Sequence, residues 1–129
     1  MTPDELAETL REHPAVSGLQ LLILHGSRAR GDGGPSSDWD LAYLAGAGPT
    51  DPIGLIAAVT SAVGTDDVDV ADLASGSALL RYRAARDGVA LLERTPDAFL
   101  DFRLVAVRFW CDAGPVIRAA QADVLASLG

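Results

Sequence analysis

Three short segments of strand length, separated by stretches of helical or turn character, most constrain how this chain can fold. Leu19–His25 is an almost continuous apolar run, Trp39–Ala45 is a second one, and Asp67–Leu73 alternates between acidic and apolar residues. Strands of this kind must pair into a sheet that buries at least one face. Their alternation with helical patterns predicts an α/β or α+β domain, with a small mixed β-sheet flanked by helices that we expect on one face.

Capping and stop signals mark the expected helices. Thr2-Pro3-Asp4-Glu5 has the form of a capping box with proline at the first helical position. Asp51-Pro52 opens another helix, which Gly64 stops. The expected elements are helix 2–12, strand 19–25, strand 39–45, helix 51–63, strand 67–73, helix 77–87, strand 89–92, and a final helical region 95–128 that we expect to be broken near Gly114-Pro115.

Size and charge narrow the class of protein. The 129 residues suffice for a single domain, which we place at residues 1–129. A net charge of −8 is opposite to the basic footprint of proteins that bind long nucleic acid. The N-terminus lacks the features of a signal peptide, the apolar run Leu21–Leu24 is too short to cross a bilayer, and Cys111 has no disulfide partner. We therefore expect a cytoplasmic protein.

The segment between the first two strands carries the chemical signal. Gly26 and Ser27 follow the first strand directly, and ten residues later the second strand begins with Asp38-Trp39-Asp40. A glycine lets the backbone approach a ligand, and the serine hydroxyl and N–H at the start of a helical turn suit a phosphate. Side chains alternate along a strand, so Asp38 and Asp40 share one face. Two carboxylates this close favour a divalent cation between them, and Mg²⁺ fits because it prefers hard oxygen ligands.

The third expected strand is also acidic, and its aspartates alternate with apolar residues as Asp38 and Asp40 do in the second strand. Asp67 and Asp69 point to one side of it, while Val68 and Val70 point to the other. If this strand lies beside the second, three or four carboxylates converge, an arrangement that suits two metal ions and an in-line attack on a phosphorus atom. We select Asp69 as the third carboxylate because it lies mid-strand, with Asp67 as the alternative; Asp72 has the opposite parity.

The spacing from Gly26-Ser27 to Asp38-Trp39-Asp40 resembles the signature of the polymerase-β-like nucleotidyltransferase superfamily. Chain length and the segment 68–73 make the sequence most similar to the minimal nucleotidyltransferases, many of which are antitoxins paired with a HEPN-domain toxin ribonuclease. The resemblance implies a nucleotidyltransferase fold and a reaction, dependent on two Mg²⁺ ions, that transfers AMP from ATP to a hydroxyl. In the antitoxin members this hydroxyl belongs to a tyrosine of the HEPN toxin. It also implies the site: Asp38, Asp40 and Asp69 as catalytic, metal-binding residues, and Gly26 and Ser27 as nucleotide-binding residues. From its charge in the same loop we add Arg28 to the nucleotide-binding residues, because an arginine can neutralise a triphosphate.

Alternatives remain at this point. A small-molecule nucleotidyltransferase of the antibiotic-modifying type usually has an additional helical domain, and there is little room for one here. A binding module with a vestigial site could neutralise a partner by contact alone. Arg28 is as compatible with a solvated loop charge as with a triphosphate ligand, Arg30 fits plain surface better, and His25 fits a structural role.

Trp39 and Tyr43 are expected in the core. A helical stripe is expected to cover the sheet and partly to form a partner interface; its members are Phe99, Phe102, Ala106, Phe109 and Ala113.

Overall fold

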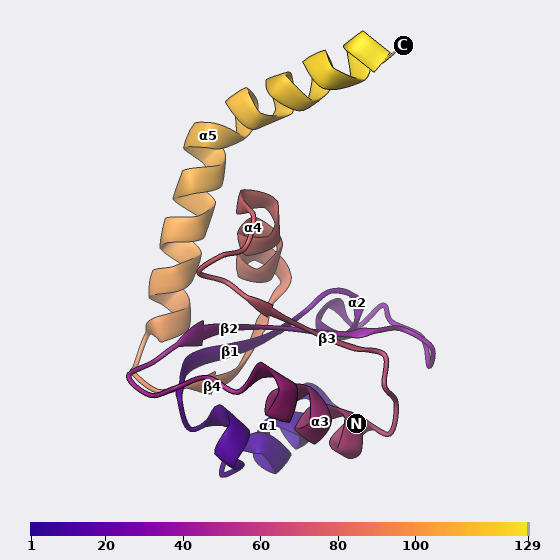
Figure 1. The fold of residues 1–129 in the computed structure, drawn as a ribbon, viewed down its shortest axis with the longest axis vertical. Coiled ribbons are helices and arrows are strands. Elements are labelled where there is room, and N and C mark those ends of the chain that lie inside the picture. Colours follow the sequence, from indigo (N-terminus) through magenta and orange to yellow (C-terminus); the bar gives the residue numbers. More distant parts are fainter. Residues whose placement is uncertain (129) are drawn as a thin grey trace.

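A mixed sheet forms the centre of the protein, whose computed structural model describes residues 1–128 (Figure 1). Within these residues the sheet has four strands in the order β3-β2-β1-β4: β1 (Leu19–His25), β2 (Trp39–Ala45), β3 (Val68–Asp72) and β4 (Val89–Glu93). β1 pairs antiparallel with both β2 and β4, whereas β2 and β3 run parallel. The predicted α+β class with a small mixed sheet is confirmed.

Four helical elements within residues 1–128 begin at a residue whose side chain accepts a hydrogen bond from one of their first N–H groups. In α1 (Pro3–Leu10), Thr2 Oγ1 accepts a hydrogen bond from the Glu5 N–H (3.1 Å) and Glu5 Oε1 accepts one from the Thr2 N–H (3.4 Å), as predicted. At the start of the helix over Pro52–Val63, Asp51 Oδ1 accepts a hydrogen bond from the Gly54 N–H (2.9 Å). The remaining helical elements are η1 (Pro14–Val16), α2 (Ser27–Arg30), α3 (Pro52–Val63), α4 (Ala78–Asp87) and α5 (Ala98–Leu128).

Helices cover both faces of the sheet, so the expectation of helices on one face is wrong. Figure 1 shows α1 and α3 on one side and α4 and α5 on the other. The reason lies in β1, where Leu22 and Leu24 pack into the core with α1 and α3, while Leu21 and Ile23 pack into a second core with α4 and α5. A strand that is buried on both faces needs a layer on each.

The final helical region also differs from the prediction. α5 runs as one helix from Ala98 to Leu128 with Pro115 inside it, where a break was expected. A proline within a helix removes one hydrogen bond and crowds the preceding turn, which can bend a helix without ending it. Figure 1 shows α5 changing direction along its length and extending away from the sheet.

The predicted core residues are borne out in part. Trp39 and Tyr43 are buried, as expected, in the core beneath α1 and α3. Of the α5 stripe, Phe102 and Ala106 are buried against the sheet, but Phe109 is 55% exposed and does not cover it. Across residues 1–128, the structure contains no helix with the length and apolar character needed to span a bilayer.

Candidate active site

The turn that follows β1 brings backbone directly against an acidic side chain. Gly26 has φ +74°, and its carbonyl accepts hydrogen bonds from the N–H groups of Ala29 and Arg30 (3.1 Å each), which closes the short helix α2. A Cβ placed on Gly26 would overlap Oδ2 of Asp40 and lie 3.3 Å from its Cγ. Both the positive φ and the lack of space therefore require glycine here.

The acidic residues of the second and third strands lie side by side. Asp40 in β2 is the register partner of Asp69 in the parallel strand β3, and it is also opposite His25 in β1. These three side chains share the face of the sheet that carries Ala42 and Ala71, which belong to the core formed with α4 and α5. The predicted juxtaposition of Asp40 and Asp69 is present.

Asp38 lies directly before β2 and completes the acidic region. Together with Asp66, Asp67, Val68 and Asp69 it lines a small pocket of about 190 Å³. Asp67 is thus also at the site, and its carbonyl accepts a hydrogen bond from the Trp39 N–H (2.9 Å). Among residues 1–128, no three histidine, cysteine or carboxylate side chains already stand in a metal-binding group. The carboxylates are gathered in one region and would still have to turn toward a shared cation.

The charges around Asp40 influence one another. Burial raises the pKa of Asp40, and the negative charges of Asp38 and Asp69 raise it further, while His25 and Arg30 partly oppose this rise. Burial lowers the pKa of His25, against the opposing effect of the nearby carboxylates. The site therefore disfavours ionisation of Asp40 in the absence of a further cation, and binding of a divalent cation would relieve this cost.

Arg28 fastens the glycine-rich loop between α2 and β2. Its Nε and Nη2 atoms donate to the carbonyl oxygen of Ser37 (3.2 and 3.1 Å), and Nη2 also reaches the carbonyl oxygen of Pro35 (3.3 Å). The guanidinium lies over the ring of Trp39, 4.5 Å from its centroid. Arg28 thus holds the loop against the start of β2, and its role toward a nucleotide stays a prediction.

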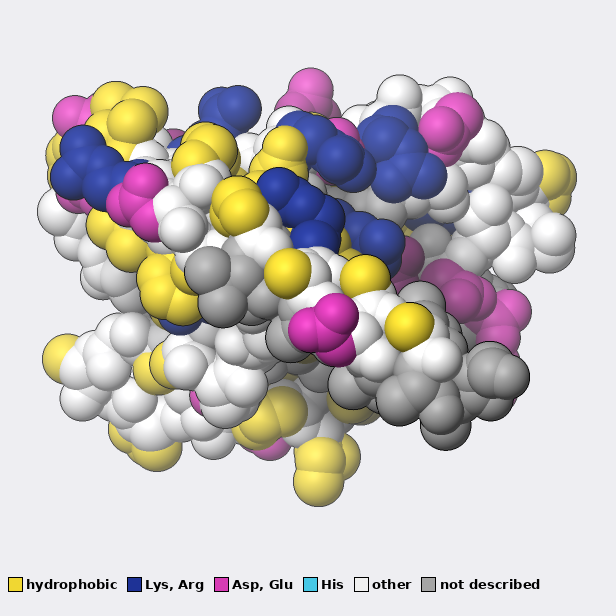
Figure 2. Space-filling model, turned by 90° about the horizontal axis from the view of Figure 1, so that it is seen from above, with side chains coloured by type: hydrophobic (Ala, Val, Ile, Leu, Met, Phe, Trp, Pro, Cys, Tyr) yellow, Lys and Arg dark blue, Asp and Glu magenta, His cyan; other side chains and the backbone are white. Residues whose placement is uncertain are grey.

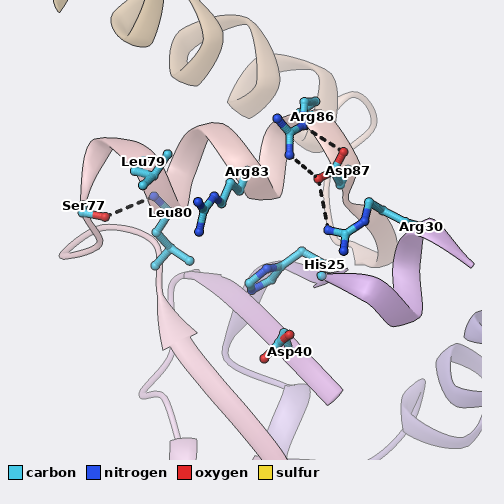
Figure 3. Close-up of a pocket in the computed structure, with 10 residues that line it drawn as sticks. His25, Arg30, Asp40, Ser77, Leu79, Leu80, Arg83, Arg86 and Asp87 are labelled. Atoms are coloured by element: carbon cyan, nitrogen blue, oxygen red, sulfur yellow. Dashed lines mark hydrogen bonds and ion pairs between the residues drawn. The ribbon is translucent and has the colours of Figure 1, made fainter. Parts of the chain in front are cut away.

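A cleft of about 580 Å³ opens above Asp40, between the sheet and α4. Asp87, at the end of α4, lies between Arg86 (2.8 Å) and Arg30 (3.6 Å), so that it connects α4 to α2. Arg30 is therefore part of the cleft, where plain surface was expected. The residues that line the cleft are drawn in Figure 3: His25, Gly26, Arg30, Asp40, Ser77, Leu79, Leu80, Arg83, Arg86 and Asp87.

Sequence reasoning missed the contribution of α4 to this cleft. The segment was predicted as a helix, but its arginines Arg81, Arg83 and Arg86 received no role. Three arginines within two helical turns, in a protein whose net charge is negative, are the signal that could have indicated a role for α4. Seen from above, arginine side chains gather across the middle of the face formed by α4 and α5 (Figure 2).

Comparison with known proteins identifies the family. A sequence model described as polymerase beta, nucleotidyltransferase, matches residues 4–97. The chain belongs to this nucleotidyltransferase family. Among curated relatives, the nucleotidyltransferase is 31% identical to the protein adenylyltransferase MntA of Aphanizomenon flos-aquae, with 77% of this chain and 74% of that protein covered.

The nucleotidyltransferase is similar in structure to chains of solved toxin–antitoxin complexes. A chain in the structure of a toxin–antitoxin with AMP-PNP superimposes with a TM-score of 0.75 and 28% identity, covering 97% of this chain and 99% of that one. A chain in the complex of tri-AMPylated Shewanella oneidensis HEPN toxin with MNT antitoxin superimposes with a TM-score of 0.68 and 27% identity, covering 95% of both chains. The nucleotidyltransferase fold predicted from the sequence is confirmed.

Proposed function

We propose that this nucleotidyltransferase is a protein adenylyltransferase that acts as an antitoxin. It would transfer AMP from ATP to the phenolic hydroxyl of a tyrosine in a HEPN-domain toxin. The observation that carries the proposal is the pairing of Asp40 with Asp69 on adjacent strands, with the backbone of Gly26 against Asp40. The likeness to MntA and to chains of toxin–antitoxin complexes supports the acceptor and the antitoxin role.

The donor set fits a hard divalent cation. Asp38, Asp40 and Asp69 supply carboxylate oxygens, which Mg²⁺ prefers, and the raised pKa of Asp40 indicates a place where added positive charge is favourable. We assign these three residues as the metal-binding, catalytic set, for two Mg²⁺ ions. When bound, the metal would supply charge neutralisation for the triphosphate and a lower pKa for the acceptor hydroxyl.

The remaining residues of the motif position the nucleotide. In this proposal, the N–H groups at the start of α2 and the hydroxyl of Ser27 would hold the β- and γ-phosphates beside Gly26. The acceptor oxygen then attacks the α-phosphorus in line as its proton is released. A new phosphoester bond forms, the bond between the α- and β-phosphates breaks, and pyrophosphate leaves. Residues 1–129 act as a single domain in this proposal, and the need for ATP agrees with a cytoplasmic location.

Label transfer tests the proposed function. The protein is incubated with Mg²⁺ and with ATP labelled at the α-phosphate, with and without the protein encoded by the neighbouring gene. We expect label on the partner, and its loss in Asp38→Asn and Asp40→Asn. Asp4→Asn, an equal change of charge on α1, is the matched control and should keep full transfer. A partner that is inhibited without label would support the contact-only module, and transfer by Asp40→Asn would refute the assigned site.

A further inference from the structure

Arg83 points into the cleft from α4, on the side opposite Asp40 and His25 (Figure 3). Its side chain is exposed, and within the described residues it has neither a hydrogen bond nor an ion pair with any protein group. The cleft thus has the Asp40 carboxylate on one side and, facing it, a guanidinium whose N–H donors are all available.

The other two arginines of α4 are already engaged. Arg81 donates to the carbonyl oxygen of Leu73 (3.0 Å) and lies over the ring of Phe102. Arg86 forms two hydrogen bonds with the carboxylate of Asp87 (2.9 and 2.8 Å). Arg83 therefore differs from its neighbours, because neither packing nor pairing within the described part of the chain accounts for it.

The shape and charge of the cleft favour a phosphate. A volume of about 580 Å³ lies in the range of small-molecule sites. One wall combines Arg83 with Arg30, Arg86 and Asp87, and Arg30 also pairs with Asp32 (3.2 Å). Three arginines thus stand against two carboxylates, so the wall carries a net positive charge, which is that of Arg83. A planar guanidinium presents parallel N–H donors that match two phosphate oxygens. A phosphate held between this wall and a cation on the Asp40 carboxylate would be bound from both sides.

We propose that Arg83 is a phosphate-binding residue of the nucleotide cleft. This inference rests on the proposed function, and its ligand is a nucleotide phosphate from one of two sources. One is the β,γ-diphosphate end of the donor ATP. The other is the phosphodiester of an AMP group already attached to the acceptor, a species that exists in the Shewanella complex, whose toxin carries three AMP groups.

The test compares Arg83→Gln with Arg11→Gln in the full chain. Arg11 lies at the end of α1 in the opposite layer and pairs only with the exposed Glu8 among the described residues, so it matches the change of charge without touching the cleft. Calorimetry measures the affinity for Mg²⁺–AMP-PNP, which represents the donor, and for the dinucleotide ApA, which represents the attached AMP. Arg83→Lys keeps the charge but loses the planar fork and should fall between wild type and Arg83→Gln.

We expect Arg83→Gln to weaken one of the two probes by about tenfold, as for loss of a charge-assisted hydrogen bond. Weaker AMP-PNP binding with uniformly slower transfer identifies the donor phosphates. Weaker ApA binding identifies the acceptor phosphodiester. In that case mass spectrometry should show that the first AMP is still added normally and that later AMP groups are not. Affinities for both probes equal to those of Arg11→Gln would overturn the proposal. Because binding is measured without turnover, this result is distinguishable from failure of the adenylyltransferase reaction itself.

Discussion

Replacing Gly26 by alanine would show whether the turn after β1 sets the position of the Asp40 carboxylate. At φ +74° and ψ −162° the backbone lies where a residue with a side chain is strained by about 1–3 kcal/mol. The added Cβ would also overlap Oδ2 of Asp40, and moving that carboxylate off its rotamer costs about 1 kcal/mol more. The expected loss of about 2–4 kcal/mol corresponds to a fall in Tm of about 8–16 °C for a chain of this size.

Gly31→Ala is the matched control for this change. Gly31 also has a positive φ (+82°), but a Cβ there meets no atom within 4 Å, so the substitution introduces backbone strain of about 1 kcal/mol alone. Scanning calorimetry gives the Tm of both variants, and α-phosphate label transfer gives their activity. Gly26→Ala should lose transfer by at least about a hundredfold, because a misplacement of about 1 Å has that effect. Equal stability and equal activity of the two variants would refute the reasoning.

Further outcomes follow from the charges and caps of the site. Burial raises the pKa of Asp40, so its ionisation opposes folding; Asp40→Asn should therefore raise the Tm at pH 7 without divalent cations, and the gain should vanish at acid pH, where Asp40 is protonated in both states. Arg28→Leu removes the bonds to the carbonyl groups of Ser37 and Pro35, so limited proteolysis should cut the loop at 31–37 faster than in wild type. Ser77 caps α4 through the Leu80 N–H (3.1 Å); Ser77→Ala should lower the free energy of unfolding by about 1 kcal/mol in denaturant titrations.

Local signals in the sequence were enough to predict the strands and the acidic part of the site. Strand parity placed Asp40 and Asp69 on one face, and the structure has them as register partners. Strand parity also placed Asp72 on the face opposite Asp69, and in the structure Asp72 is the register partner of the core residue Tyr43. These relations depend on spacing within short segments, which the sequence states directly.

Relations between distant segments could not be predicted in the same way. The apolar stripe of a helix shows that one face is buried but does not show which side of the sheet it covers, so the two-sided arrangement was missed. The position of Arg83 opposite Asp40 depends on how α4 packs after β3, and no local pattern links these two residues. The continuity of α5 across Pro115 depends on the surroundings of the helix. The sequence shows only that a proline disfavours the interior of a helix.

The central strand β1 determines at what stage of unfolding the candidate site is lost. Leu21–Leu24 of β1 are fully buried, and the strand is hydrogen-bonded on both sides, so its amides can exchange with solvent only through near-global opening. His25 and the Gly26 turn are the direct continuation of this strand. The slowest-exchanging amides of the protein should therefore lie next to the turn proposed to bind phosphate. Heating should abolish the proposed nucleotide binding together with the last protected structure rather than before it.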